Sequence, residues 1–202
     1  YKLMGLAPYG EPKYTGPILE HLMDLKEDGS FRLDLDYFDY CTGLRMTSER
    51  FHALFGGAPR QPDELLTQHH MDLAASIQNV TEEVVLRLTR GLAQETGMDN
   101  LCLAGGVALN CVANGKVLRD DAFKNIWIQP AAGDAGGALG AALTAHHLFQ
   151  GQPRKVEPGR DAMAGSYLGP AFSQTQIETE LREAGARFET LGEAELISVV
   201  AQ

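Results

Sequence analysis

The sequence predicts an α/β fold. Two stretches, 101–119 and 125–149, each run from a short apolar segment through a glycine-rich turn into a helical stretch. This order is typical of strands that lie side by side in an open sheet, with ligands bound beyond their carboxyl ends. A third observation is a long segment of helical periodicity between Leu65 and Glu95.

The first part of the chain predicts smaller elements. Residues 1–17 are rich in Gly and Pro, which predicts a structured loop with a turn at Ala7–Gly10. A short helix is expected over 18–25, and the alternation of polar and apolar residues over 29–35 favours a half-buried strand. Residues 45–63 read as a loop with a short helix.

The long helix is predicted from its spacing. Its apolar positions fall three or four residues apart, at Leu73, Ile77, Val80, Val84, Leu88 and Leu92. They share one face of a helix about 40 Å long. Gly97 is expected to end this helix, because glycine readily adopts the left-handed conformation that closes helices.

The remaining elements define the domain organisation. We expect strands at 101–104 and 125–129 and helices at 111–119 and 135–149. Residues 151–159 form a connector rich in Pro and Gly, which places one domain at 1–150 and a connector with the beginning of a second α/β region at 151–202. The chain opens without Met and closes in an uncapped helical stretch, so we expect it to be part of a longer protein.

Composition excludes several classes of protein. The net charge of −10 argues against nucleic-acid binding through phosphates, and the sequence holds no run of the roughly 20 apolar residues that span a bilayer. We therefore expect a soluble cytoplasmic protein with no membrane partner. Cys41, Cys102 and Cys111 lack the spacing of a zinc site and are expected to be reduced, with Cys102 buried in its strand.

The two glycine turns are the candidate binding elements. Gly105 and Gly106 follow the first predicted strand and form either a plain tight turn or a turn that lets a phosphorylated ligand approach the backbone. Asn110 either caps the next helix or donates to a ribose or phosphate. Asp134, in the second turn, is a helix N-cap, a hard oxygen ligand for a divalent cation, or both.

Other polar residues are weaker candidates. The pairs His69–His70 and His146–His147 are adjacent on predicted helices, where neighbouring side chains diverge by about 100° and do not converge on one ion. Lys2, Tyr9 and Lys13 are either solvated or directed at a substrate. No nucleophile motif is present, and we assign no catalytic acid, base or nucleophile in this chain.

Three blocks of sequence resemble the NodU/CmcH family of O-carbamoyltransferases. They are Lys2–Gly10, Leu103–Cys111 and Ile128–Gly140. The resemblance implies a ribonuclease-H-like lobe of the kind found in actin, Hsp70, sugar kinases and the enzyme that attaches threonylcarbamoyl to tRNA. This chain would supply the second of two lobes that hold a nucleotide, and the first lobe and a C-terminal YrdC-like domain would lie elsewhere in the same protein.

The same resemblance implies a reaction. Carbamoyl phosphate and ATP give carbamoyl-adenylate, and the carbamoyl group then passes to a hydroxyl of a small molecule, in this family a precursor of an antibiotic or a signalling molecule. Asp134 would be the metal ligand from this lobe, with Fe(II) the expected ion and Mn or Mg also compatible with a carboxylate. The residues placed against the adenylate would be Gly105, Gly106, Val107, Asn110, Gly133 and Gly136.

Two alternatives stay open at this point. A sugar or acyl kinase with an actin-like fold would use the same glycine turns and release ADP. A non-catalytic module would bind nucleotide without turnover. The resemblance also implies that this chain by itself is inactive, since its metal-binding histidines would come from the first lobe.

Overall fold

The computed structural model describes residues 2–201 and is a mixed α/β structure, as predicted. Its contacts divide the chain into two units, Tyr1–Arg154 and Lys155–Gln202. Within residues 2–201, none of the helices is both long and apolar enough to cross a bilayer.

The helices of the first unit are α1 (Lys2–Leu6), α2 (Thr15–Pro17), α3 (Glu49–Phe55), α4 (Gln68–Thr96), α5 (Cys111–Arg119) and α6 (Ala135–Thr144). Its strands are β1 (Met23–Leu25), β2 (Phe31–Leu33), β3 (Asn100–Leu103) and β4 (Asn125–Ile128). Single turns of 3-10 or π-helix extend several of these elements, among them Ile18–Leu22 and Ala145–Phe149.

Helix α4 is the long helix that the sequence predicts, and both of its ends are capped. Thr67 and His70 form a capping box in which each side chain bonds the backbone of the other residue. Gly97 closes the helix in the left-handed conformation, with φ of +61°, and its N–H bonds the carbonyl of Ala93. The predicted stop at Gly97 is confirmed.

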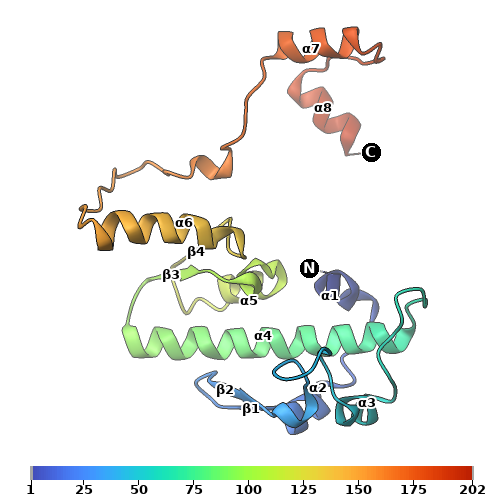
Figure 1. Cartoon of the computed structure of the whole chain (residues 1–202). Helices are drawn as coiled ribbons and strands as arrows, with labels where there is room; N and C mark the ends of the chain where they lie inside the picture. The colour runs from blue at the N-terminus through green and yellow to red at the C-terminus, as the bar shows by residue number, and fades with distance from the viewer. Residues whose placement is uncertain (1, 202) are drawn as a thin grey trace. The chain divides into compact units, whose positions relative to one another are not determined.

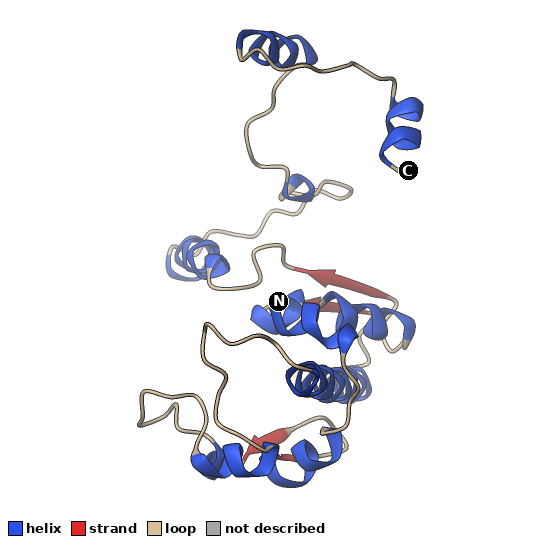
Figure 2. Ribbon diagram, turned by 90° about the vertical axis from the view of Figure 1, so that its right-hand side faces the viewer, coloured by secondary structure: helices blue, strands red, loops and turns tan. Residues whose placement is uncertain are grey.

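Helix α4 packs against a hydrophobic core on each of two sides. On one side Val80 and Val84 are buried with Ile18, Leu22, Met23 and Phe55. On the other side Val85, Leu86 and Ala93 pack against a cluster of Leu101, Val117 and Phe123. Figures 1 and 2 accordingly show α4 running between the β1–β2 side and the β3–β4 side of the first unit.

The two pairs of strands differ in direction. Strands β1 and β2 form an antiparallel hairpin in which Met23 faces Leu33. Strands β3 and β4 are parallel, with Leu101 opposite Ile126 and Leu103 opposite Ile128. A parallel pair requires a crossover, which α5 provides, and the predicted helix and both predicted strands of this part are confirmed within one residue.

Three expectations were wrong in detail. Residues 2–6 form α1 in place of a loop, because this segment lies along α4 and is held by it, whereas the turn predicted at Ala7–Gly10 is present as a 3-10 turn closed by the Gly10 N–H on the carbonyl of Ala7. The helix expected over 18–25 ends at Leu22, where β1 begins. Cys102 is exposed, because it alternates with the buried Leu101 and faces away from the core.

The second unit contains α7 (Gln174–Glu183) and α8 (Glu193–Val200). Ser173 and Gln176 form a capping box at the start of α7. Arg182 forms an ion pair with Glu178 and lies 5.7 Å from the centre of the Phe188 ring. Among its described residues none is buried, so this unit is held by local contacts.

The first core can be tested at Phe55, which is 4% exposed and lies against Tyr14 and Phe51. Replacing Phe55 with Ala should lower the free energy of unfolding by about 3–5 kcal/mol, because the ring leaves a cavity. The Phe149→Ala control removes a ring that is 90% exposed and should change the free energy of unfolding by less than about 0.5 kcal/mol. Urea unfolding of both variants measures the difference, and equal effects would contradict this core.

Candidate functional site

The two glycine turns lie side by side at the carboxyl ends of β3 and β4. The strands run in parallel and end level with each other, at Leu103 and Ile128. The backbone N–H of Gln129 donates to the carbonyl of Leu103 over 3.0 Å, and the N–H of Gly105 donates to the carbonyl of Ala132 over 2.8 Å. Two turns that are well separated in sequence therefore lie next to each other at the same edge of the β3–β4 sheet.

The first turn has a backbone that depends on glycine. Gly105 has φ of +106° and ψ of 160°, a conformation that is essentially restricted to glycine. A 3-10 turn over Gly106–Leu109 follows, and the side chain of Asn110 accepts a hydrogen bond of 3.1 Å from the N–H of Ala113. Asn110 is thus the cap of α5, one of its two predicted roles.

The second turn leaves a carboxylate exposed. Asp134 occupies the N-cap position of α6 but is in the α conformation, and its side chain makes no capping bond. Within residues 2–201 the side chain of Asp134 has no hydrogen-bond or ion-pair partner. Gly136 is required for packing, because a Cβ there would lie 2.0 Å from the carbonyl oxygen of Ala131. The capping bond expected of Asp134 is therefore not made.

The other predicted site residues belong to the same two turns. Val107 is 61% exposed and lies on the first turn, and Gly133 immediately precedes Asp134. At Gly106 and Gly133 a Cβ would meet no atom within 4 Å, so the space beside the backbone is open. All seven predicted binding residues lie in the two turns that the Gly105–Ala132 hydrogen bond joins or at the helix starts that follow them, and whether they contact a nucleotide or a metal stays a prediction.

Two residues of α4 that were not predicted from the sequence hold the end of the first turn through polar contacts. Gln78 and Glu82 of α4 are each 6% exposed, and Gln78 exchanges two hydrogen bonds with the side chain of Asn110. Their spacing of four residues, which places both side chains on one face of the predicted helix, was the only indication in the sequence.

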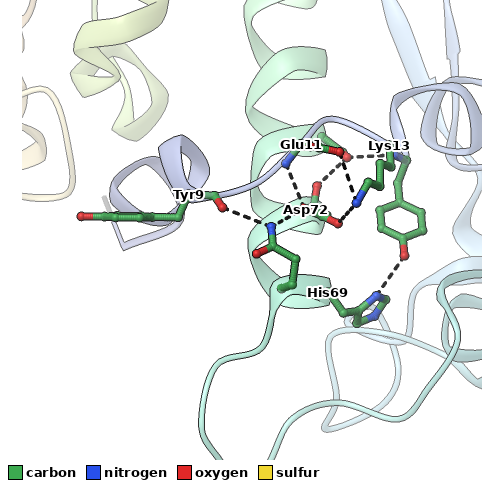
Figure 3. Close-up of polar contacts among 8 residues, drawn as sticks. Tyr9, Glu11, Lys13, His69 and Asp72 are labelled. Carbon is green, nitrogen blue, oxygen red and sulfur yellow. Dashed lines mark hydrogen bonds and ion pairs between the residues drawn. The ribbon is translucent and has the colours of Figure 1, made fainter.

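The opening segment is fastened to α4 by a nearly buried carboxylate. Asp72 accepts bonds from the Lys13 ammonium at 2.8 Å, the Glu11 N–H at 2.9 Å and the Gln68 amide at 2.8 Å (Figure 3). The Lys13 ammonium, followed by the other two donors, lowers the pKa of Asp72 to about 2. Lys13 is therefore paired with Asp72, while the Tyr9 side chain is 70% exposed.

The adjacent histidines point to different partners. The Tyr14 hydroxyl lies 3.0 Å from Nδ1 of His69, a contact marked by the dashed line at His69 in Figure 3, whereas His70 belongs to the cap with Thr67. The two side chains thus have different hydrogen-bond partners, although their rings lie edge to face with centroids 5.7 Å apart. Among residues 2–201 no group of three or more His, Cys, Asp or Glu side chains is placed to hold a metal ion.

A separate cavity of about 730 Å³ lies beside the β1–β2 hairpin. Its lining combines carboxylates such as Asp24 and Asp34 with Arg32 and Arg87. None of the predicted site residues lines it. The glycine turns, which combine open space beside the backbone with a carboxylate that has no partner within residues 2–201, are the better candidate site.

Comparison with known proteins identifies the class of this chain. The profile of the carbamoyltransferase N-terminus family matches residues 1–143. The chain belongs to this carbamoyltransferase family, which confirms the resemblance seen in the sequence.

Individual relatives cover most of the chain. It is 63% identical over 182 residues to uncharacterized protein sll1178 of Synechocystis, a match that covers 90% of this chain and 29% of that protein. It is 40% identical over 191 residues to nodulation protein NolNO of Sinorhizobium fredii, a match that covers 94% of this chain and 26% of that protein. It is 39% identical over 181 residues to nodulation protein NolO of Bradyrhizobium diazoefficiens, a match that covers 90% of this chain and 30% of that protein. The chain thus spans under a third of the length of these relatives.

The Asp72 cluster predicts a pH dependence of stability. Because folding lowers the pKa of Asp72 from 3.8 to about 2, its stabilisation is complete above about pH 4 and is lost as the pH falls toward 2. In the Asp72→Asn variant the urea midpoint should be lower than in the wild type at neutral pH. The difference should shrink between about pH 4 and pH 2, because Asp72 takes up a proton in the unfolded chain below its pKa of 3.8 but stays charged in the folded protein until about pH 2. A difference that stayed constant from neutral pH to pH 2 would contradict the role of this carboxylate.

The first turn predicts a second stability effect. Replacing Gly105 with Ala should lower the free energy of unfolding by about 1–3 kcal/mol, because its backbone conformation disfavours any Cβ. Gly57→Ala is the matched control, since Gly57 is exposed and an added Cβ there meets no atom within 4 Å. Urea unfolding should separate the two variants, and a tolerated Gly105→Ala would show that the turn has another conformation.

Proposed function

We propose that this chain forms part of an ATP-dependent O-carbamoyltransferase. The carbamoyl group would come from carbamoyl phosphate by way of carbamoyl-adenylate and pass to a hydroxyl of a small molecule. Membership of the carbamoyltransferase family supports carbamoyl transfer. The observation that carries the finer proposal is the hydrogen bond from Gly105 to Ala132, which joins two ligand-accessible glycine turns beside a free carboxylate.

The first unit is proposed to be one lobe of a ribonuclease-H-like domain. Its parallel strands β3 and β4, the crossover helix α5 and the long α4 fit that architecture. The first lobe and a YrdC-like domain, in which the adenylate would form, are proposed for the rest of the longer protein, and this chain is proposed to supply the second lobe. The short share of its relatives that this chain spans is consistent with such an arrangement.

The first turn is proposed to hold the adenylate. Gly105 and Gly106 leave the backbone open, and the α5 N-terminus next to Asn110 favours the negative charge of a phosphate. Backbone N–H groups placed in this way would also stabilise the charge that develops as the phosphate leaves. Val107, Gly133 and Gly136 would complete the surface around the nucleotide.

Asp134 is the residue of this chain that fits a divalent cation. Its carboxylate is exposed and has no partner within residues 2–201, which suits a hard oxygen ligand, and further ligands would have to come from outside this chain. Iron, manganese and magnesium are all compatible with a carboxylate. When bound, such an ion supplies positive charge next to the carbamoyl oxygen.

In the proposed transfer step the carbamoyl group passes directly from the adenylate to the acceptor, with no covalent intermediate on this chain. The acceptor oxygen forms a bond to the carbamoyl carbon, the bond from that carbon to the adenylate phosphate breaks, and AMP leaves with the electron pair. The proton of the acceptor hydroxyl passes to solvent water in the same step. The residues of this chain would orient the adenylate and stabilise the leaving phosphate, which are the tasks that helix-end amides perform.

The proposal is tested on the full-length protein. ATP should be converted to AMP and pyrophosphate only when carbamoyl phosphate is present, and mass spectrometry should detect carbamoyl-adenylate. Release of ADP would instead indicate a kinase with the same turns, and binding of ATP without turnover would indicate a non-catalytic module.

Asp134 supplies the residue-level prediction. The Asp134→Ala variant should lose carbamoyl transfer by about a hundredfold or more while still forming carbamoyl-adenylate, because only the transfer step would use this carboxylate. Asp63→Ala, which removes an exposed acid outside both turns, should retain wild-type activity. Transfer rates with any accepted hydroxyl compound measure both variants, and unchanged transfer in Asp134→Ala would exclude this role.

A further inference from the structure

We infer that Gln78 is a positioning residue for the nucleotide site, acting through Asn110. The inference rests on the proposed function, because it takes the first glycine turn to hold the adenylate. The observations that carry it are the polar contacts that run from Lys116 of α5 through two buried side chains of α4, Glu82 and Gln78, to Asn110 at the cap of α5.

The side chains of Gln78 and Asn110 form a reciprocal pair. Nδ2 of Asn110 donates to Oε1 of Gln78 over 2.9 Å, and Nε2 of Gln78 donates to Oδ1 of Asn110 over 3.2 Å. The same Oδ1 accepts the N–H of Ala113 over 3.1 Å. The amide of Asn110 is therefore bound on both of its polar atoms, and its rotation would break at least two hydrogen bonds.

A buried carboxylate fixes which way the Gln78 amide faces. Nε2 of Gln78 also donates to Oε1 of Glu82 over 2.7 Å, and the ammonium of Lys116 pairs with the other Glu82 oxygen. An ionised carboxylate only accepts hydrogen bonds, so the NH₂ group of Gln78 must face Glu82 and its oxygen must face Asn110. Lys116 belongs to α5, so the chain of contacts begins and ends on the helix that Asn110 caps.

Because Gln78 and Glu82 are buried, breaking the contacts between these side chains is energetically costly. Gln78 and Glu82 are each 6% exposed, and a buried amide that loses its partners is not compensated by water. The consequence is that α4 sets the orientation of Asn110, and Asn110 in turn holds the end of the turn that begins at Gly105. A substitution at Gln78 should therefore weaken nucleotide binding, although the Gln78 side chain itself does not contact the nucleotide.

The test uses photolabelling by 2-azido-AMP in the full-length protein. Trypsin releases the first turn in the peptide 91–116 and Asp134 in the peptide 125–154, so labelling at this site can be read separately from labelling elsewhere. In the Gln78→Met variant the concentration that half-saturates labelling of peptide 91–116 should rise about tenfold, the effect of losing one well-placed hydrogen bond.

A matched control separates positioning from stability. Ser76 is fully buried on the same helix, where its hydroxyl accepts the N–H of Tyr14. The Ser76→Ala variant should lose stability but keep the wild-type labelling concentration within about twofold, because Ser76 faces the opening segment and not the glycine turn. If Ser76→Ala weakened labelling as much as Gln78→Met, the positioning role would be refuted.

A double-mutant cycle completes the test. Asn110→Ala should weaken labelling, and adding Gln78→Met to it should have no further effect, since Gln78 acts only through Asn110. Weaker labelling in Asn110→Ala together with wild-type labelling in Gln78→Met would overturn this inference and leave the proposed function intact. Absence of labelling on peptide 91–116 in the wild type would overturn the proposed nucleotide site and the inference together.

Discussion

The structure of the first unit depends on one helix that is packed on two sides. Helix α4 contributes Val80 and Val84 to one core and Val85 and Leu86 to the other. A helix that serves two cores cannot shift toward one without loosening the other, because interiors are close-packed. Elements that are distant in sequence, the hairpin of β1 and β2 and the pair of β3 and β4, are therefore held in a common frame.

The same helix carries buried polar side chains between its apolar rows. Asp72 and Ser76 bond the opening segment, Gln78 bonds Asn110 at the cap of α5, and Glu82 pairs with Lys116 of α5. Buried polar groups are tolerated only when they are hydrogen-bonded, and in the described residues every buried side-chain polar atom has a partner. These contacts give α4 a second task, since they set the position of segments that the apolar cores do not reach.

The candidate site consists of the two glycine turns, which lie beyond the ends of β3 and β4. Parallel strands that end together place the two glycine turns at one edge, and backbone hydrogen bonds join the turns there. Asn110 is bound to α4, whereas Asp134 is exposed and has no partner within the described residues. Membership of the carbamoyltransferase family gives this contrast its chemical meaning, because the proposed transfer needs one rigid surface for the nucleotide and one carboxylate available for a cation.

The sequence by itself determined the elements with strong local patterns. The spacing of apolar residues and the stop at Gly97 predicted α4, and the apolar runs beside glycines predicted β3, β4 and α5, because these features are read from neighbouring residues. It also identified the glycine turns and the family. Only the tertiary structure decided that residues 2–6 are helical, that Cys102 is exposed, that Asp72 holds Lys13, and that Gln78 lies beneath Asn110. Each of these depends on contacts between residues far apart in the chain, and local periodicity carries no information about which distant partner a polar or small side chain will meet.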